Sequence, residues 1–343
     1  MSPQSSQAVA ADGLLILHPG ALGDVVATFP ALLELQRRFR PLSLLCQGHI
    51  AALASRLGVI DAPLALESSV FGALFGAPPH PRLADLLGSC GRALVFSACP
   101  QLAENLRRCL PAAALHPVTP RPPLDRRTHV LQHLYDQLVA CGLLAPAARP
   151  APAPFVSAAP QPPPPGAPIL LHPGAGSPRK RWPLASFLTV AAGLEARGLQ
   201  PAFLLGPAEA DLAERLQHAV PPNRRLHRVA DLFQLQQLLE AAGGLIGNDS
   251  GISHLGAFLG LPTVAVFGPS DAARWAPSGP AVTALRSAPD CPRCFETAAE
   301  NCQEALCLSG IRPETVLKAF LTLYHRGLGK KSGDDDDRPH PRG

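Results

Sequence analysis

Residues 244–271 constrain the fold of this chain more than any other segment. An apolar run over 244–247 ends in Asn248-Asp249-Ser250-Gly251, and the residues that follow predict a helix. A second apolar run, over 263–267, ends in another polar turn at 268–271. Strand, turn, helix and strand in this order place both turns at the carboxyl edge of a parallel sheet, where open α/β sheets bind their ligands.

The turn at 248–251 has the features of a phosphate site. Asp249 or Ser250 can cap the following helix, and Gly251 lets a ligand approach the backbone closely. Free amides and the positive end of the helix dipole then face the edge of the sheet. Both stabilise an anion, so the turn predicts a bound phosphate group. His254 follows in the first turn of the same helix.

Two further strand-and-turn signatures indicate two similar halves. Apolar residues 14–17 lead into His18-Pro-Gly20, and apolar residues 169–171 lead into His172-Pro-Gly174. About 150 residues separate the two signatures, which is the usual size of a domain. Neither turn has the three spaced glycines of the dinucleotide fingerprint, and neither is a Walker loop. We therefore predict an α/β protein with two Rossmann-like domains.

The chain divides at a stretch rich in proline and alanine. Four consecutive prolines stand at 162–165, and such a stretch predicts an extended spacer because it cannot form a helix or a sheet. The predicted parts are an N-terminal domain over 1–145, a linker over 146–167, a C-terminal domain over 168–311, an amphipathic helix over 312–326 and a disordered tail over 327–343.

Strands and helices alternate along both predicted domains, as in parallel sheets covered by helices on both faces. Strands are expected at 14–17, 42–46, 93–97, 169–172, 201–205, 244–247 and 263–267. Helices are expected at 24–39, 99–109, 127–142, 183–197, 208–218, 231–242 and 250–260.

Composition limits the cellular context. The 343 residues, 47% of them apolar, suffice for two cores, and a net charge of +4 is too small to imply nucleic acid. No segment reaches the ~20 uninterrupted apolar residues of a membrane span, and the N-terminus lacks the pattern of a signal peptide. We therefore expect a cytoplasmic protein.

Five short motifs, taken in order, resemble those of one known family. They are Gly20-Ala-Leu-Gly-Asp24, His172-Pro-Gly-Ala-Gly176, Lys180-Arg-Trp-Pro183, Asn248-Asp-Ser-Gly-Ile-Ser-His254 and Phe267-Gly-Pro-Ser-Asp271. In these residues the chain resembles the ADP-heptose:lipopolysaccharide heptosyltransferases of glycosyltransferase family 9. The resemblance implies inverting transfer by a GT-B fold, in which the two Rossmann-like domains face each other across a cleft. In this fold the helix at 312–326 is expected to pack back on the N-terminal domain.

The resemblance also implies roles for single residues. Asp24 matches the base that deprotonates the acceptor hydroxyl, although an aspartate there could instead only cap a helix. Lys180 and the amides of Ser250 and Gly251 match the groups that meet the donor diphosphate, where charge builds as ADP leaves. Arg181 is expected to be a solvated neighbour of Lys180.

Other matches concern the sugar and the nucleotide. Asp249 matches an acid that engages the donor sugar or orders the site, and His254 lies further along the same helix. Glu209 could bond the ribose hydroxyls, as acidic residues do in related sheets. Ala230 and Leu232 align with the adenine-side loop.

Two features depart from a simple match. Many members of the family have arginine where this chain has His18, so one positive charge is expected to depend on pH. Late in the chain Cys291, Cys294, Cys302 and Cys307 have a spacing that could hold a structural zinc ion.

The function that the resemblance implies is transfer of heptose from ADP-heptose to the inner core of lipopolysaccharide. No metal or other cofactor is expected for the chemistry. The expected partners are the nucleotide sugar and a lipid-linked saccharide acceptor at the inner membrane face, with the protein a monomer. The alternatives are a relative that uses another nucleotide sugar or acceptor, and a binding protein without turnover.

Overall fold

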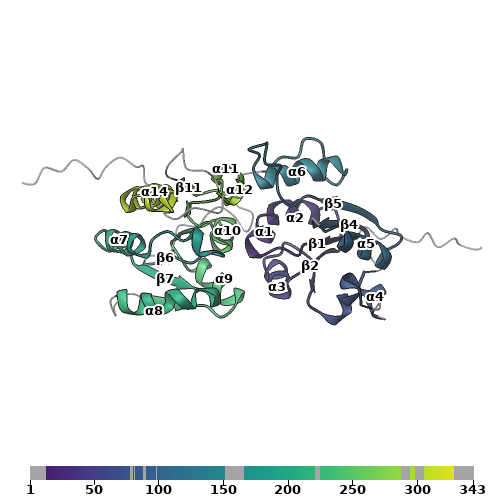
Figure 1. Ribbon diagram of the computed structural model, residues 1–343, viewed down its shortest axis with the longest axis horizontal. Helices are drawn as coiled ribbons and strands as arrows, with labels where there is room; N and C mark the ends of the chain where they lie inside the picture. The colour runs from purple at the N-terminus through teal and green to yellow at the C-terminus, as the bar shows by residue number, and fades with distance from the viewer. Residues whose placement is uncertain are drawn as a thin grey trace, which may run out of the picture. The chain divides into compact units, whose positions relative to one another are not determined.

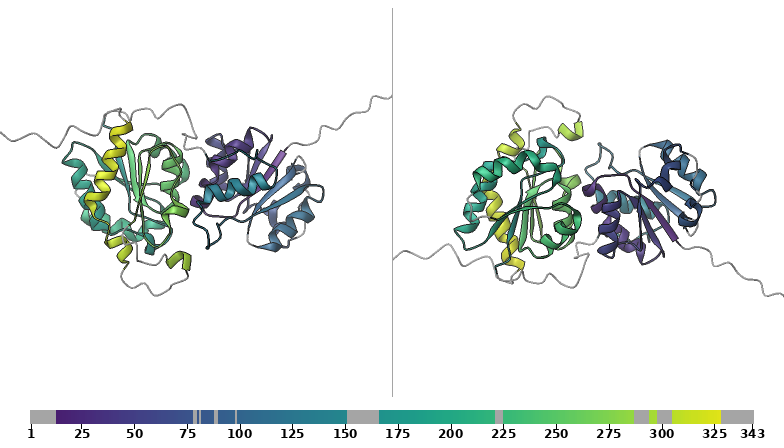
Figure 2. Two further views of the ribbon diagram at one scale, coloured as in Figure 1. Left: turned by 90° about the horizontal axis from the view of Figure 1, so that it is seen from above. Right: turned by 90° about the horizontal axis from the view of Figure 1, so that it is seen from below.

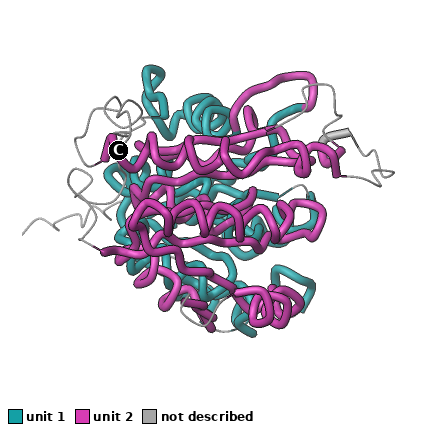
Figure 3. Tube along the Cα trace, turned by 90° about the vertical axis from the view of Figure 1, so that its left-hand side faces the viewer, with its two compact units in different colours: residues 1–123, 130–151 teal, residues 124–129, 152–343 magenta. Residues whose placement is uncertain are grey.

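A computed structural model describes residues 13–77, 80, 82–87, 90–97, 99–150, 166–220, 225–286, 294–297 and 305–327. The chain forms two compact units (Figure 3). Unit 1 comprises 1–123 and 130–151, and unit 2 comprises 124–129 and 152–343. Most of the predicted linker (151–165) and of the predicted tail (328–343) lies outside the described residues.

Unit 1 is built on a parallel sheet with the strand order β3-β2-β1-β4-β5 (Figure 1). Its strands are β1 Gly13–Leu17, β2 Leu42–Cys46, β3 Ala62–Ala65, β4 Cys90–Phe96 and β5 Ala114–Val118. Its helices are α1 Leu22–Val26, α2 Phe29–Gln36, α3 Gly48–Arg56, η1 Ser69–Phe75, α4 Leu83–Leu87, α5 Pro100–Cys109 and α6 Val130–Ala140. The strand order reverses between β1 and β4, the place where Rossmann-type sheets bind ligands.

Unit 2 has a parallel sheet with the order β11-β10-β9-β6-β7-β8. Its strands are β6 Ile169–His172, β7 Pro201–Leu205, β8 Arg225–Arg228, β9 Gly244–Asn248, β10 Thr263–Phe267 and β11 Val282–Arg286. Its helices are η2 Pro178–Lys180, α7 Leu184–Glu195, η3 Pro207–Glu209, α8 Ala210–Ala219, α9 Leu232–Glu240, α10 Gly251–Phe258, α11 Ala272–Trp275, α12 Cys294–Thr297, α13 Leu306–Ser309 and α14 Pro313–Gly327. The order reverses between β6 and β9. The two parallel sheets confirm the predicted α/β class.

One predicted helix is divided in two. Residues 24–39 were expected to form a single helix, but α1 ends at Val26 and α2 begins at Phe29. Pro30 has no amide hydrogen to donate to the carbonyl of Val26, so the α-helical ladder cannot continue through it. Next to this break the hydroxyl of Thr28 donates to the carbonyl of Val25 at 2.7 Å.

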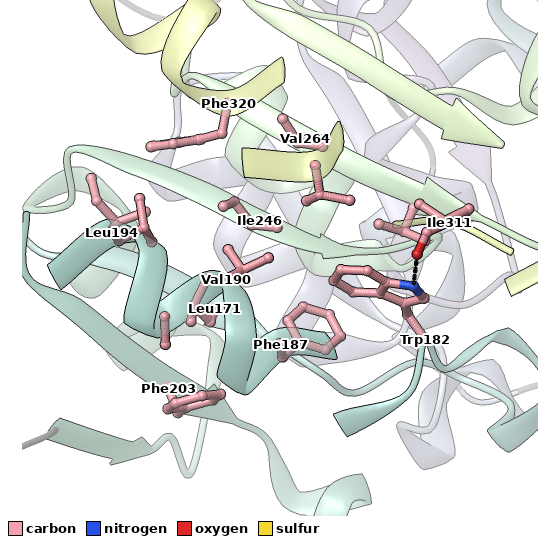
Figure 4. Close-up of a cluster of buried hydrophobic side chains, with 14 of the residues drawn as sticks. Leu171, Trp182, Phe187, Val190, Leu194, Phe203, Ile246, Val264, Ile311 and Phe320 are labelled. Atoms are coloured by element: carbon pink, nitrogen blue, oxygen red, sulfur yellow. Dashed lines mark hydrogen bonds between the residues drawn. The ribbon is translucent and has the colours of Figure 1, made fainter. Parts of the chain in front are cut away.

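The last helix packs on the sheet of its own unit, and the expectation that residues 312–326 also pack on the N-terminal domain stays a prediction. Val316, Phe320 and Leu323 of α14 join the core that α7 and α8 form on one face of the sheet of unit 2 (Figures 2 and 4). Glycines of unit 2 provide the space. A Cβ at Gly193 would lie 2.5 Å from Leu317, and a Cβ at Gly244 would lie 2.5 Å from Phe320.

In the described part of the chain, no helix is long and apolar enough to cross a membrane.

The contact between Gly244 and Phe320 can be tested by adding a single methyl group. Gly244→Ala should lower the free energy of unfolding by about 1–3 kcal/mol, because the new Cβ overpacks a full core. Chemical denaturation measures this change. Gly176→Ala is the matched control, since no atom lies within 4 Å of a Cβ there. Equal stability of the Gly244→Ala variant and the wild type would contradict the packing of α14.

Candidate functional site

The predicted phosphate turn follows β9, at the point where the strand order of unit 2 reverses. Ser250 is the N-cap of α10, and its hydroxyl accepts a hydrogen bond from the amide of Ser253 at 3.3 Å. Of the two residues predicted as caps, Ser250 has that role, which leaves the carboxylate of Asp249 for other contacts. Gly251 begins the helix and is half-buried, and His254 is buried on it.

The side chain of Asn248 joins this turn to the turn after β6. Its amide nitrogen donates to the carbonyls of Pro173 at 2.9 Å and Gly174 at 3.0 Å. Its amide oxygen accepts from the backbone nitrogen of Trp182 at 3.0 Å. Asn248 is completely buried, so an unsatisfied amide would be costly here. The motif includes Asn248, but the role of this side chain was not predicted; a polar residue that closes an apolar strand is the signal for it.

Lys180 and Asp249 form an ion pair. The Lys180 Nζ lies 2.7 Å from Asp249 Oδ2, with 26% of the lysine side chain and 8% of the aspartate side chain exposed. Two motifs far apart in the sequence thus place a cation beside the N-terminus of α10. The lysine remains partly open to solvent, so an incoming anion can reach it.

The segment around Lys180 is held on both sides. Trp182 is buried, donates from its indole nitrogen to the carbonyl of Ile311 at 3.2 Å and packs edge-on against Phe187 (Figure 4). Arg181 is not the solvated neighbour that was expected. Its side chain is 14% exposed and pairs with Asp211 at 2.5 Å. These contacts leave Lys180 as the residue of this pair that faces the site.

Glu209 lies in a buried network at the adjoining strand ends. Its Oε2 accepts from the amide of Gly206 at 2.7 Å and lies 4.0 Å from Nε2 of His172. Burial alone would raise the pKa of Glu209, but the facing imidazole and the Gly206 amide outweigh it, and the pKa is lowered. On its other ring nitrogen His172 faces the hydroxyl of Ser250 at 3.4 Å. Glu209 and Ser250 are therefore linked through one imidazole.

The other predicted nucleotide residues lie at the start of α9. The amide of Ala230 donates to the side chain of Gln234 at 3.0 Å, and Leu232 is half-buried. Asp231 caps the helix through the amide of Gln234 at 2.8 Å.

The late cysteines are described only in part. Cys291 and Cys302 lie outside the described residues, whereas Cys294 and Cys307 are buried thiols. Within the described ranges, no three histidine, cysteine or acidic side chains gather as metal ligands. The predicted zinc site thus remains a prediction.

In unit 1 the turn after β1 carries Asp24. Asp24 is exposed in the first turn of α1, whose N-cap is Ala21. Since no side chain caps this helix, the alternative that Asp24 serves as its cap does not hold. The carboxylate is left open to solvent.

His18 shapes this turn without carrying a charge. Its ring stacks on Phe96 at 4.6 Å, and its Nδ1 accepts from the amide of Gly20 at 3.1 Å. Burial lowers the pKa of His18 from 6.5 to about 4, and the carboxylate of Asp24 opposes this only in part. His18 is therefore neutral at pH 7, and it gains the expected positive charge only well below that pH.

Residues 124–129 were not predicted as part of unit 2. They lie between β5 and α6 of unit 1, yet they bind the loop after β10. Arg127 pairs with the buried Asp271 at 3.3 Å, and Arg274 donates to the carbonyl of Arg126 at 3.1 Å. His129 contacts the carbonyl of Ala276 at 2.8 Å.

Part of this chain matches a known protein family. Residues 157–303, which carry the Lys180, Asp249 and Ser250 motifs, match the sequence model of glycosyltransferase family 9 (heptosyltransferase). This part of the chain is similar to glycosyltransferase family 9. The match confirms the resemblance in the four motifs between His172 and Asp271, whereas the motif at Gly20–Asp24 lies outside the matched residues.

Known proteins are similar to the chain in sequence and in fold. Lipopolysaccharide heptosyltransferase 3 of Escherichia coli is 32% identical over 113 residues, which are 32% of this chain and 33% of that protein. The match thus spans about a third of the curated relative. A family 9 glycosyl transferase from Veillonella parvula has a TM-score of 0.72 at 18% identity, with 93% of this chain and 98% of that chain covered. The Escherichia coli heptosyltransferase WaaC with ADP has a TM-score of 0.64 at 18% identity, with 91% and 99% covered. The solved structures establish the GT-B fold.

The neutral state of buried His18 predicts a pH-dependent stability. Between pH 6.5 and about 4 the unfolded chain binds a proton at His18 that the folded chain does not. The free energy of unfolding should therefore fall as the pH drops through this window, by at most about 1.4 kcal/mol per pH unit. Denaturation of the wild type and of His18→Gln across the window measures the difference.

Groups other than His18 titrate in both proteins, so the difference between the two curves isolates this residue. Parallel curves for the wild type and His18→Gln would contradict a buried neutral imidazole.

Proposed function

We propose that this chain is a glycosyltransferase that moves heptose from ADP-heptose to the inner core of lipopolysaccharide. The observation that carries the proposal is the pair of Lys180 and Asp249 beside the N-terminus of α10. The relatives support the two substrates in part. One is a lipopolysaccharide heptosyltransferase by name, and another was solved with ADP.

Unit 2 has the groups that a departing diphosphate requires. Negative charge grows on the β-phosphate as the bond to the sugar breaks, and a positioned cation with amide donors stabilises that charge. Lys180 supplies the cation, and the amides of Ser250 and Gly251 at the N-terminus of α10 supply the donors. The Lys180 ammonium is already held by Asp249, so little reorganisation is needed when the donor binds. Asp249 and His254 then face the sugar.

The same arrangement places the nucleoside further along the strand ends. Glu209 would accept from the ribose hydroxyls, and Ala230 with Leu232 would border the adenine. Since His172 connects Glu209 to Ser250, the ribose and phosphate subsites share one buried imidazole.

Asp24 is proposed as the base that takes the proton of the acceptor hydroxyl as it attacks the anomeric carbon. A solvent-exposed carboxylate without a capping role suits this task, because it is free to meet a large acceptor. The absence of a side chain at Gly20 lets His18 and Asp24 lie close to this turn. A Cβ at Gly20 would lie 2.7 Å from the ring of His18 and 3.0 Å from the Cβ of Asp24.

The proposal includes a cytoplasmic monomer that contacts the inner membrane face peripherally and needs no metal for the transfer. Its alternatives are another nucleotide sugar or acceptor, and a binding protein without turnover. The exposed Asp24 together with the paired Lys180 argues against a binding protein, because recognition of the donor alone requires no base.

A panel of nucleotide sugars tests the function. Release of ADP from ADP-heptose in the presence of truncated lipopolysaccharide should exceed release from the other donors, as measured by mass spectrometry.

Asp24→Ala should lower the rate of this transfer about 10²–10⁴-fold, since the base acts in the transition state. ADP binding should stay near the wild-type value, because the base acts on the acceptor. Asp136→Ala, an exposed aspartate on α6, is the control. Wild-type turnover by Asp24→Ala would exclude the base assignment.

Lys180→Ala should weaken donor binding and also slow turnover, since the ammonium opposes the diphosphate charge before and during departure. Calorimetry with ADP and steady-state kinetics separate the two effects. Lys180→Arg should restore activity only in part, because the two cations differ in reach and hydrogen-bond geometry. A change limited to the Michaelis constant of the acceptor would place Lys180 elsewhere.

A further inference from the structure

Two consecutive residues of α12 contact the two consecutive cations of the turn that carries Lys180. The guanidinium of Arg179 lies 4.8 Å from the ring centroid of Phe295, and the ammonium of Lys180 lies 5.4 Å from the same centroid. Arg179 also donates to the sulfur of Cys294 at 3.2 Å. One aromatic ring thus faces two positive charges.

Phe295 is attached to the same edge of the sheet as the phosphate turn. Its amide donates to the carbonyl of Pro269 at 3.3 Å, in the turn directly after β10. Leu308 packs on the adjoining residue of that turn, since a Cβ at Gly268 would lie 2.6 Å from its side chain. The ring is therefore anchored through its backbone as well as through the two cations.

An aromatic ring holds a cation in a way that a carboxylate cannot. The face of the ring attracts positive charge through its quadrupole but carries no net charge of its own. Asp249 neutralises much of the charge on Lys180, whereas the ring of Phe295 adds no negative charge beside Arg179. The guanidinium of Arg179 next to the Lys180–Asp249 pair therefore adds positive charge that can meet a dianionic or trianionic group.

We propose that Phe295 is a positioning residue that holds Arg179 and Lys180 toward the diphosphate of the donor. Arg179 is then a second cation of this subsite, which sequence comparison with the family motif did not indicate. The inference rests on the proposed function, and it adds a consequence. Phe295 should contribute to the preference for a nucleoside diphosphate over a monophosphate, because both cations serve the outer phosphate.

Calorimetric titration with ADP and with AMP tests the role of Phe295. Phe295→Leu keeps an apolar side chain but removes the ring, and it should weaken ADP binding about 3- to 10-fold. AMP binding should change less than about 2-fold, because AMP lacks the outer phosphate that the two cations would meet. Phe295→Tyr should restore the wild-type affinity for ADP, because it retains the ring face. Phe75→Leu, at an exposed phenylalanine of unit 1, is the matched control.

A double-mutant cycle with Lys180→Ala separates positioning from a direct contact. If Phe295 acts through the cations, Phe295→Leu should weaken ADP binding less in the Lys180→Ala background than in the wild type. Wild-type affinity of Phe295→Leu for ADP would overturn the inference, as would equal losses for ADP and AMP or a failure of Phe295→Tyr to restore binding. If the wild type itself binds no ADP, the proposed function fails first and the inference fails with it. Binding that depends on Lys180 but not on Phe295 overturns the inference alone.

Discussion

The buried amide of Asn248 is the group on which the arrangement of unit 2 depends most. Three hydrogen bonds join its side chain to the turn after β6 and to Trp182, while its own carbonyl accepts from the hydroxyl of Ser253 at 2.6 Å. Strand β9, the first turn of α10 and the segment that carries Lys180 are therefore held by one residue. Because Asn248 is completely buried, each of these bonds is stronger than it would be in water, and losing one partner leaves a buried polar group unsatisfied. The distance between Lys180 and Asp249 follows from this connection.

How well the fold could be predicted depended on the position of each strand in its sheet. All seven predicted strands are present, and they include every inner strand of both sheets. The four strands that were not predicted, β3, β5, β8 and β11, are the four edge strands. An inner strand of a parallel sheet is buried on both faces and reads as a continuous apolar run. An edge strand such as β8, with the sequence Arg-Leu-His-Arg, has two exposed residues out of four and gives no such signal.

Some residues of the candidate site could be predicted from the local sequence, whereas the contacts between them could not. Ser250, Gly251 and Asp24 belong to turns that the local sequence predicts. The contacts that give the site its electrostatics come from residues far apart along the chain. The pairing of Lys180 with Asp249, the ring of Phe295 over two cations, and the burial of His18 against Phe96 all depend on tertiary structure. No spacing in the sequence indicates that His18 is neutral, because its pKa is lowered by burial in the folded protein.

Residues 124–129 belong to unit 2, although the segments on both sides of them belong to unit 1. The chain leaves unit 1 after β5, contributes Arg127 to unit 2 and returns to unit 1 before the stretch rich in proline and alanine begins. A cut within that stretch would leave the N-terminal fragment with an arginine whose partner is missing. It would also leave the C-terminal fragment with Asp271 uncovered. Halves exchanged between relatives during evolution would therefore have to match at this short segment as well as at their own sheets. The contacts of residues 124–129, and not the stretch rich in proline and alanine, determine which residues belong to each unit.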